Sequence, residues 1–250
     1  MPLSIQLINQ CLLNQKSVGV IAVDPTSPFT GGALLGDRVR MNEHSWNDKV
    51  YIRSMGNQGK LGGLSIKAQE VGDVLAASGK DIIIFETVGV GQAEHDIISA
   101  ADLSIVVLVP ESGDEVQLMK AGIIEIGDIF VINKSDRKGA NKLASKLKNI
   151  LHFFNKENIN EPEVYNTCAT EGKGIVELYL GIQNCIKIMK ENNTLKFRKI
   201  KRYEKRITEI VNESLIKSFW SDKRKLLLEE LTNLSNLDLL SPEKIANKIT

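Results

Sequence analysis

Short apolar runs alternate with segments of helical spacing from Val18 to Lys190. The runs are rich in Val and Ile, which is typical of strands buried on both faces of a parallel sheet. Strands are predicted at Val18–Val23, Asp81–Phe85, Leu103–Val109, Ile129–Ile132 and Glu163–Asn166, with a further candidate at Val50–Arg53. Helices are predicted at Ser65–Ser78, Gln92–Ala101, Asp114–Glu125, Gly139–Asn155 and Gly174–Lys190. This order predicts an α/β fold with a mostly parallel sheet and helices on both faces.

The pattern changes after Asn192, where longer stripes of helical spacing replace the short apolar runs. Several apolar residues follow that spacing: Tyr203, Ile207, Ile210, Val211, Leu215 and Phe219. Ser241-Pro242 reads as an N-cap followed by Pro at the first position of a last short helix. Basic residues crowd the start of this region, but interspersed glutamates favour a solvated face over an RNA or lipid surface. We therefore predict two domains, residues 1–192 and a helical arm at 193–250.

Composition adds little to this picture. The 250 residues are 42% hydrophobic and 25% charged, with a formal net charge of +1, so no global charge favours nucleic acid. Three widely separated cysteines indicate a reducing compartment instead of a disulfide framework. No stretch approaches the roughly 20 apolar residues that span a bilayer. The expectation is a cytoplasmic protein without a membrane or nucleic-acid partner.

The segment Ile132-Asn133-Lys134-Ser135-Asp136 carries the most specific chemical signal. It follows a predicted strand and has the pattern Asn-Lys-x-Asp. The Asp136 carboxylate can accept two parallel bonds from N1–H and the 2-amino group of guanine, and adenine lacks both donors. Asn133 and Lys134 would steady the loop and flank the base. Alone, the pattern also fits a polar loop after a strand, but with the other motifs it favours GTP and GDP as ligands.

Carboxylates also follow two other predicted strands. Asp24 ends the run from Val18, and Glu86 ends the run from Asp81. Because ligands bind outside the carboxyl ends of parallel strands, both side chains would face a shared crevice. Carboxylate oxygens suit Mg²⁺, so Asp24, Glu86 and Asp37 are the candidate metal residues. Each of them also fits a helix cap or a solvated loop when taken singly.

Several strings together resemble one family, the MeaB/ArgK-type GTPases, which are related to the metallochaperone GTPases. The most specific of them is Glu86-Thr87-Val88-Gly89-Val90-Gly91-Gln92. The others are Ala22-Val23-Asp24-Pro25-Thr26-Ser27, Thr30-Gly31-Gly32, Leu35-Gly36-Asp37, Gly59-Lys60-Leu61-Gly62-Gly63, Gly113-Asp114-Glu115 and Val131-Ile132-Asn133-Lys134-Ser135-Asp136. The resemblance runs nearly end to end and implies a P-loop NTPase-like fold.

This resemblance implies specific roles for several residues. Asp24 and Asp37 would lie in a magnesium-contacting first switch, and Glu86, Gly89 and Gln92 would lie in a second switch. In such a site the attacking water would be held near Glu86 or near the Asp24 loop, so both residues are catalytic candidates, with Glu86 preferred. The last guanine-contacting loop would be Thr167-Cys168-Ala169-Thr170, with Cys168 where Ser is more usual. A thiol is a weaker hydrogen-bond partner than a hydroxyl.

The resemblance also implies a biological role. Such proteins hydrolyse GTP to GDP and phosphate, and they act as chaperones of a cobalamin-dependent acyl-CoA mutase of the methylmalonyl-CoA mutase type. The residue 110–120 segment would be a third switch that signals to the mutase. The C-terminal arm would form a homodimer.

One expected motif is missing. A family member should carry a strand and the loop Gly-x-x-x-x-Gly-Lys-Ser/Thr ahead of Val18, and the sequence contains neither. That loop supplies N–H groups, a lysine and a hydroxyl to the phosphates and Mg²⁺. We therefore expect the chain as written to be inactive as a GTPase, either as a fragment or through a misplaced start.

The missing strand would also leave a hydrophobic pairing edge, so lower stability and solubility than in a full-length relative are expected. Two alternative functions remain. The chain could be a non-catalytic, partner-docking dimerisation module that cannot bind a nucleoside triphosphate. It could also be a kinase or ATPase of amino-acid transport systems, an older family label that no phosphoacceptor-binding feature supports.

Overall fold

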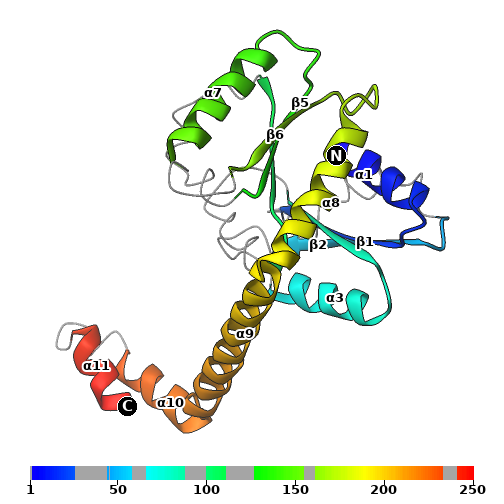
Figure 1. Cartoon of the computed structure of the whole chain (residues 1–250). Coiled ribbons are helices and arrows are strands. Elements are labelled where there is room, and N and C mark those ends of the chain that lie inside the picture. Colours follow the sequence, from blue (N-terminus) through cyan, green and yellow to red (C-terminus); the bar gives the residue numbers. More distant parts are fainter. Residues whose placement is uncertain are drawn as a thin grey trace. The chain divides into compact units, whose positions relative to one another are not determined.

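The computed structural model describes residues 2–25, 44, 46–57, 66–87, 100–110, 127–154, 161–232 and 241–250 (Figure 1). The chain divides into two compact units, Met1–Arg198 and Lys199–Thr250. The first unit contains every described strand, and the second contains only helices within its described residues.

The described strands of the first unit form two parallel sheets of three strands each. One sheet has the order β2-β1-β3, with β1 at Val18–Pro25, β2 at Val50–Asn57 and β3 at Ile82–Thr87. The other has the order β4-β5-β6, with β4 at Ile105–Leu108, β5 at Ile129–Asn133 and β6 at Glu163–Thr167. β1 and β5 are the central strands, and all five residues of β5 are buried.

Four helices cover the two faces of these sheets. Alternate residues of a strand point to opposite faces, so Val18 packs against α1 (Pro2–Leu13) while Ile21 packs against α3 (Ile66–Ala77). In β5, Val131 likewise shares a cluster with α1 and α8 (Ile175–Glu191), and Phe130 packs against α7 (Ala140–Phe154). The strands are therefore apolar on both faces, as the sequence predicts.

The predicted α/β architecture is confirmed, with a few differences in the elements. All five predicted strands and the candidate strand at Val50 are present. β2 is longer than predicted, because it continues through Gly56 to Asn57 beside β1. The predicted helices at 114–125 and, except for its last two residues, 92–101 lie outside the described residues.

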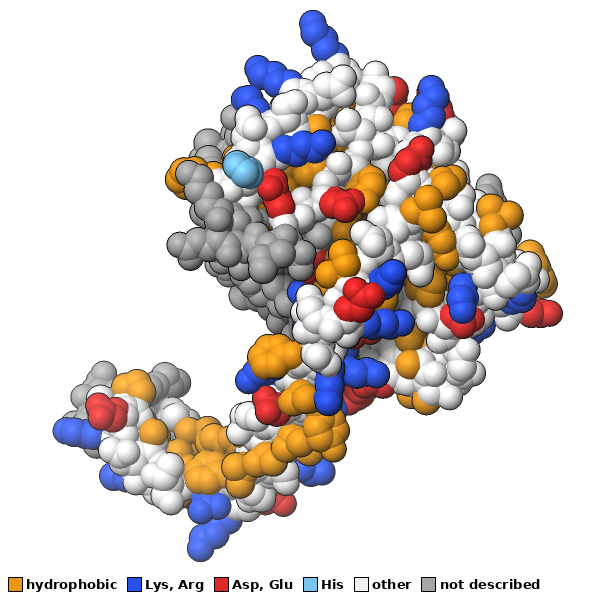
Figure 2. Space-filling view, viewed as in Figure 1, with side chains coloured by type: hydrophobic (Ala, Val, Ile, Leu, Met, Phe, Trp, Pro, Cys, Tyr) orange, Lys and Arg blue, Asp and Glu red, His pale blue; other side chains and the backbone are white. Residues whose placement is uncertain are grey.

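The second unit is built from helices that leave many apolar side chains exposed. α9 (Thr194–Phe219) begins in the first unit, and none of its 26 residues is buried. α10 (Asp222–Leu231) and α11 (Pro242–Ile249) follow, each with a serine N-cap, and the Pro242 position agrees with the sequence prediction. Figure 2 shows hydrophobic side chains gathered along α9 and α10, which agrees with their exposed fractions of 71% for Tyr203 and 60% for Leu215.

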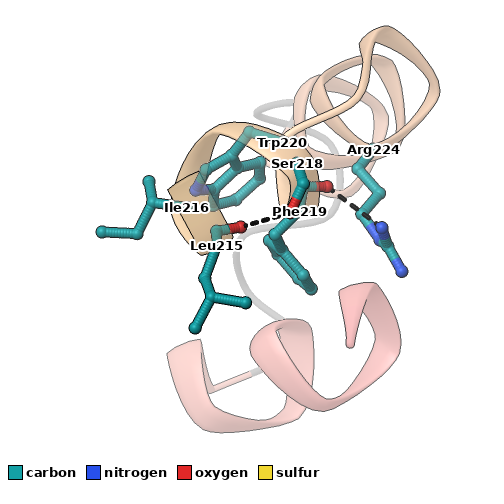
Figure 3. A pocket seen from close by; sticks show the side chains of 6 residues that line it. All are labelled: Leu215, Ile216, Ser218, Phe219, Trp220 and Arg224. Carbon is teal, nitrogen blue, oxygen red and sulfur yellow. Dashed lines mark hydrogen bonds between the residues drawn. The ribbon is translucent and has the colours of Figure 1, made fainter. Parts of the chain in front are cut away.

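A groove at the end of α9 is lined by aromatic, aliphatic and cationic side chains (Figure 3). Phe219 and Trp220 meet edge to face with ring centroids 5.3 Å apart. The Arg224 guanidinium lies 4.4 Å from the centroid of Phe219 and donates a 3.0 Å bond to the Phe219 carbonyl. Leu215 and Ile216 complete the apolar lining.

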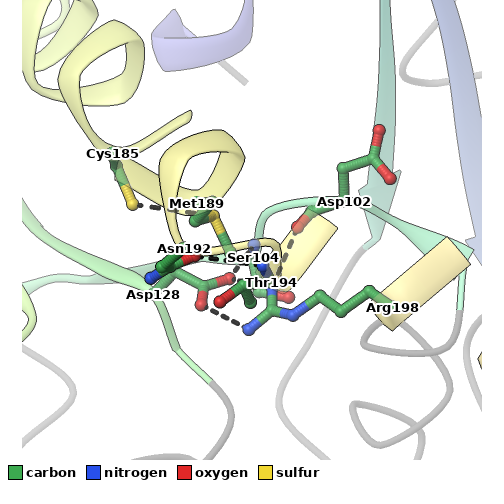
Figure 4. A network of polar contacts seen from close by, with 8 residues as sticks. All are labelled: Asp102, Ser104, Asp128, Cys185, Met189, Asn192, Thr194 and Arg198. Atoms are coloured by element: carbon green, nitrogen blue, oxygen red, sulfur yellow. Dashed lines mark hydrogen bonds and ion pairs between the residues drawn. The ribbon is translucent and has the colours of Figure 1, made fainter. Parts of the chain in front are cut away.

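The first turn of α9 is fixed to the first unit by Arg198 (Figure 4). Its guanidinium donates to both carboxylate oxygens of Asp128, at 2.7 and 2.8 Å, and to the carbonyl of Asp102 at 2.9 Å. Asp128 also accepts a 2.7 Å bond from the Ser104 amide. The hydrogen bond to Asp128 is the main cause of a raised Arg198 pKa. One arginine thus ties α9 to the segments that lead into β4 and β5.

No helix in the described ranges is long and apolar enough to cross a membrane.

Candidate functional site

The loop after β5 contains the Asn-Lys-x-Asp segment. β5 is wholly buried and ends at Asn133, whose side chain stays inside at 8% exposed. Lys134 then takes a φ of 57°, a left-handed conformation that is uncommon for a side chain other than Gly. This reversal turns the chain outward, and Asp136 is exposed. The local strain is typical of functional loops that their surroundings hold in place.

A second loop follows β6 and is closed by its own backbone. The amide of Cys168 donates to the Lys173 carbonyl at 3.0 Å, and the Lys173 amide donates back at 3.2 Å. Gly174 then has a φ of 73°, and a Cβ there would collide with the Asn166 carbonyl oxygen. Only glycine fits this position without displacing the backbone. α8 starts at the next residue, so the loop is held between a strand and a helix.

Asn133 joins the two loops from the inside. Its Oδ1 accepts a 3.2 Å bond from the Thr167 hydroxyl and another 3.2 Å bond from the Ala169 amide. The Ser135 amide also donates to the Thr167 carbonyl at 3.0 Å. Because Thr167 is fully buried, these bonds are shielded from competing water. Asn133 therefore acts as the internal brace of the site.

Cys168 joins the loops a second time, at the surface side. Its Sγ donates to Asp136 Oδ1 at 3.2 Å and lies 3.4 Å from the Thr170 hydroxyl. Cys168 itself is 2% exposed, while Asp136 remains exposed. The thiol thus fixes the orientation of a carboxylate whose remaining acceptor positions are available to a ligand. Cysteine makes this contact despite being a weaker partner than serine.

A cation also lies beside this carboxylate. The Lys173 ammonium is 2.6 Å from Glu171, and the hydrogen bond and charge of Glu171 raise the pKa of Lys173. Lys134, in the loop that contains Asp136, is also exposed. The pair of loops therefore offers one oriented carboxylate near the positive charge of Lys173.

The predicted metal and switch residues fall partly outside the described structure. Glu86 lies in β3, half-buried, with Ala22 of β1 as its register partner. The backbone of Asp24 is at the end of β1, but its side chain, like Asp37, Gly89 and Gln92, is outside the described residues. Among the side chains that are described, no cluster of three or more metal-ligating groups is found.

Comparison with known proteins decides the family. Residues 3–224 match the family described as Methylmalonyl Co-A mutase-associated GTPase MeaB. The chain belongs to the MeaB family. A Pyrococcus abyssi protein named as a GTPase is 47% identical over 210 residues, which cover 83% of this chain and 65% of that protein. The GTPase ArgK of Escherichia coli is 38% identical over 66% of this chain and 51% of its own length.

A mammalian relative and one solved structure extend the comparison. The mouse mitochondrial methylmalonic aciduria type A homolog is 38% identical over 65% of this MeaB-family chain and 40% of its own length. A crystal structure titled LAO/AO transport system kinase shares the fold with a TM-score of 0.67 and 22% identity, covering 99% of this chain and 75% of that one. The chain spans slightly under two thirds of the Pyrococcus relatives, 65% and 66% of their lengths.

Six of the residues predicted to contact guanine lie close together in the structure, and their role as nucleotide contacts stays a prediction. Asn133, Lys134, Asp136, Cys168, Ala169 and Thr170 all lie in the two adjoining loops. The roles of Thr167 and Gly174 were not predicted, although a glycine directly before a helical pattern was a usable signal. The amide of Ala169, a predicted guanine contact, is engaged by Asn133.

Proposed function

We propose that this MeaB-family chain binds guanine nucleotides through the loops after β5 and β6. The observation that carries the proposal is the exposed Asp136 carboxylate, held by Cys168 at 3.2 Å beside the Asn133 brace. An oriented carboxylate can accept bonds from N1–H and the 2-amino group of guanine together. Adenine has no donor at either position, so the same carboxylate would be desolvated without compensation. In the proposed complex, this arrangement would favour guanine over adenine.

The reaction proposed for a form that also carries the Gly-x-x-x-x-Gly-Lys-Ser/Thr loop is hydrolysis of GTP to GDP and phosphate, with Mg²⁺ as the metal. Asp24, Asp37 and Glu86 are the residues proposed to hold Mg²⁺ directly or through water, and the ion would supply positive charge to neutralise the phosphates. Glu86 is also the residue proposed to position the attacking water. The family description, which names a mutase-associated GTPase, supports this assignment.

The proposed partner is a cobalamin-dependent acyl-CoA mutase, which the protein would serve as a chaperone. The support is the family description and the name of the mouse relative, which refers to methylmalonic aciduria. Co-elution with a purified methylmalonyl-CoA mutase in the presence of GTP tests this partner. Separate elution with GTP, with GDP and without nucleotide would count against it.

The arm is proposed to mediate a homodimer. α9 presents several apolar side chains that are at least half exposed, and the Phe219–Trp220 groove adjoins them. Large exposed apolar patches on a protein usually mark surfaces that bind another protein. A self-complementary helical surface on each copy would bury them in a two-fold dimer.

The test of the proposed function is the ratio of guanine to adenine binding. Ligand-observed NMR with GTP, GDP and ATP measures this ratio even when the dissociation constants are in the millimolar range. We expect a guanine preference of about 100-fold, because two hydrogen bonds to a charged group contribute about 3 kcal/mol together. The ratio is independent of how tightly the phosphates are held.

Asp136→Ala should abolish the preference, while Asp222→Ala, at an exposed aspartate of the arm, should leave it intact. Equal binding of GTP and ATP by the unaltered chain would overturn the guanine assignment. Absence of a guanine preference in the unaltered chain, together with an intact dimer, would favour the docking-module function instead.

A further inference from the structure

Helix α7 has two different faces. The face towards β5 is buried, and the residues on it share one hydrophobic cluster: Ala140, Ala144, Leu147 and Leu151. The outer face is formed by residues three or four positions apart, which are neighbours on one side of a helix. These residues are Lys142, Lys146, Asn149 and Phe153, and only Lys146 is half-buried while the others are exposed. One face therefore fixes α7 to the sheet, and the other is open to its surroundings.

Every charged residue around this outer face is positive. From Arg137 to Phe153 the sequence contains one arginine, four lysines and no aspartate or glutamate. The chain as a whole has a formal net charge of only +1. In Figure 2, Lys and Arg side chains gather over the start of α7 and the loop before it, in the upper part of the view. The positive charge is thus concentrated on one helix and does not reflect the overall composition.

The lysines of this face lack the ion pairs that other helices supply. On α9, for example, the Lys201 ammonium lies 3.3 Å from the Glu204 carboxylate. Lys138 and Lys142 form no ion pair with any residue in the described ranges. Like charges four positions apart on a helix, as at Lys142 and Lys146, repel each other. A negatively charged partner would relieve this repulsion.

The outer face ends in an exposed aromatic side chain. Phe153 is 67% exposed, whereas Phe130, which packs against the buried face of α7, is 0% exposed. Phenylalanine is enriched where proteins contact one another, and such residues anchor interfaces inside a rim of polar and charged groups. Phe153 next to a row of lysines therefore has the arrangement of an apolar anchor beside a basic rim.

The composition of the face favours a protein partner over a nucleic acid or a lipid surface. The planar fork of arginine is the preferred group for nucleic-acid phosphates, and Arg137 is the only arginine from residue 137 to 153. A helix that lies on a membrane inserts its apolar face, but the apolar face of α7 is already packed on β5. Lysines on a solvated rim are instead suited to pairing with single carboxylates.

We propose that the outer face of α7, together with Lys138 in the turn before it, is a docking surface for an acidic helix of a partner protein. Because two helices have the same rise per residue, carboxylates four positions apart on the partner would match Lys142 and Lys146. An apolar residue about two turns further along the partner would cover Phe153. Exposed ion pairs each contribute little affinity, so this docking is weak, rapid and strongly dependent on salt. It needs no contact with Asp136, so it can hold or fail independently of guanine binding.

The test uses the full chain and a designed probe. The probe is a fluorescent helical peptide of about 15 residues, with Glu at positions four apart on one face and Leu two turns beyond them. Fluorescence anisotropy measures its binding at about 0.02 M and about 0.3 M salt. We expect the affinity to fall at least about tenfold at the higher salt, because screening shortens the range of the charges. A peptide with Gln in place of each Glu should not bind.

Charge reversal on α7 is the decisive variant. Lys138→Glu combined with Lys142→Glu should weaken binding of the acidic peptide at least about tenfold. Lys199→Glu combined with Lys223→Glu is the matched control, because it changes the net charge equally at exposed lysines of α9 and α10, and it should keep the affinity. Phe153→Ala should weaken binding about fivefold without altering its salt dependence. Thermal unfolding of each variant, followed by circular dichroism, verifies that the fold is retained.

Several results would overturn the proposal. Absence of binding to the unaltered chain at low salt, or equal binding of the Gln peptide, would remove the role of the carboxylates. Equal weakening by the two charge reversals would mean that only the net charge matters. Tighter binding of oligouridylate or of phosphatidylglycerol vesicles, lost in Lys138→Glu with Lys142→Glu, would assign the face to nucleic acid or lipid instead.

Discussion

The loops after β5 and β6 differ from the helices of the arm in how their side chains are buried and paired. In the loops, Asn133, Thr167 and Cys168 are buried, and each makes a hydrogen bond to the other loop. In the arm, α9 buries none of its residues, and apolar side chains such as Leu215 face outward. The polar groups of the loops are paired with one another, whereas the apolar side chains of the arm remain exposed.

This difference indicates what each region is suited to bind. A preformed polar network loses little conformational entropy when a small polar ligand arrives, which favours specificity. An exposed apolar helix gains free energy only when another surface covers it. The difference agrees with the proposals that the loops bind a base and that the arm binds a protein surface.

The largest effect is expected from Gly174→Ala, which would disturb the backbone of the loop after β6. The new Cβ would collide with the Asn166 carbonyl oxygen in a left-handed backbone. We expect a loss of about 3 kcal/mol in the free energy of unfolding, measured in urea. Gly172→Ala is the control, because Gly172 has a φ of 69° but open space around it, and should cost about 1 kcal/mol. Equal costs would show that the contact with Asn166 is unimportant.

Arg198→Ala tests how the first turn of α9 is anchored within the first unit. The side chains of Arg198 and Asp128 are 25% and 15% exposed, so removal leaves a mostly buried carboxylate without its bidentate partner. We expect a loss of about 2 kcal/mol, less than for a fully buried pair. Lys201→Ala removes an exposed pair with Glu204 and should cost less than about 0.5 kcal/mol. A loss for Arg198→Ala as small as the control's would contradict the anchoring role.

The exposed face of the arm can be tested by a pair of substitutions that add the same charge. Leu215→Lys removes an apolar side chain, and Asn212→Lys changes a polar residue exposed on the same helix. If the arm forms the proposed dimer, Leu215→Lys should weaken it by about tenfold or more in analytical ultracentrifugation. Asn212→Lys should have little effect. A monomer for the unaltered chain at high concentration would remove the basis of the dimer proposal.

The smallest effect is expected at Cys168. Cys168→Ala would release Asp136, and we expect guanine affinity to fall about fivefold, equivalent to about 1 kcal/mol. Cys168→Ser should keep or slightly improve the affinity, since a hydroxyl donates more strongly than a thiol. NMR titration with GDP measures both. Wild-type affinity in Cys168→Ala would show that Asp136 is oriented by other groups.

The sequence predicted the strands well because Val- and Ile-rich runs such as Val18–Val23 differ sharply from the helical segments around them. It indicated Asp136 as a guanine contact because two donors of guanine can pair with one carboxylate, and that role stays a prediction. It could not predict that Asn133 turns inward to Thr167 and Ala169, since that depends on a loop far away in sequence. The separation into two sheets also became visible only when the strand pairing was known.

Helix α1 has a consequence for the order of events during folding. The apolar side chains of α1 pack in clusters with β1 and β3 and also with β5, which is translated much later. The helix therefore emerges from the ribosome well before part of its binding surface exists. Contacts of such large sequence separation slow folding and prolong the exposure of apolar surface. In a nascent chain, the apolar face of α1 would stay incompletely covered until β5 has been made.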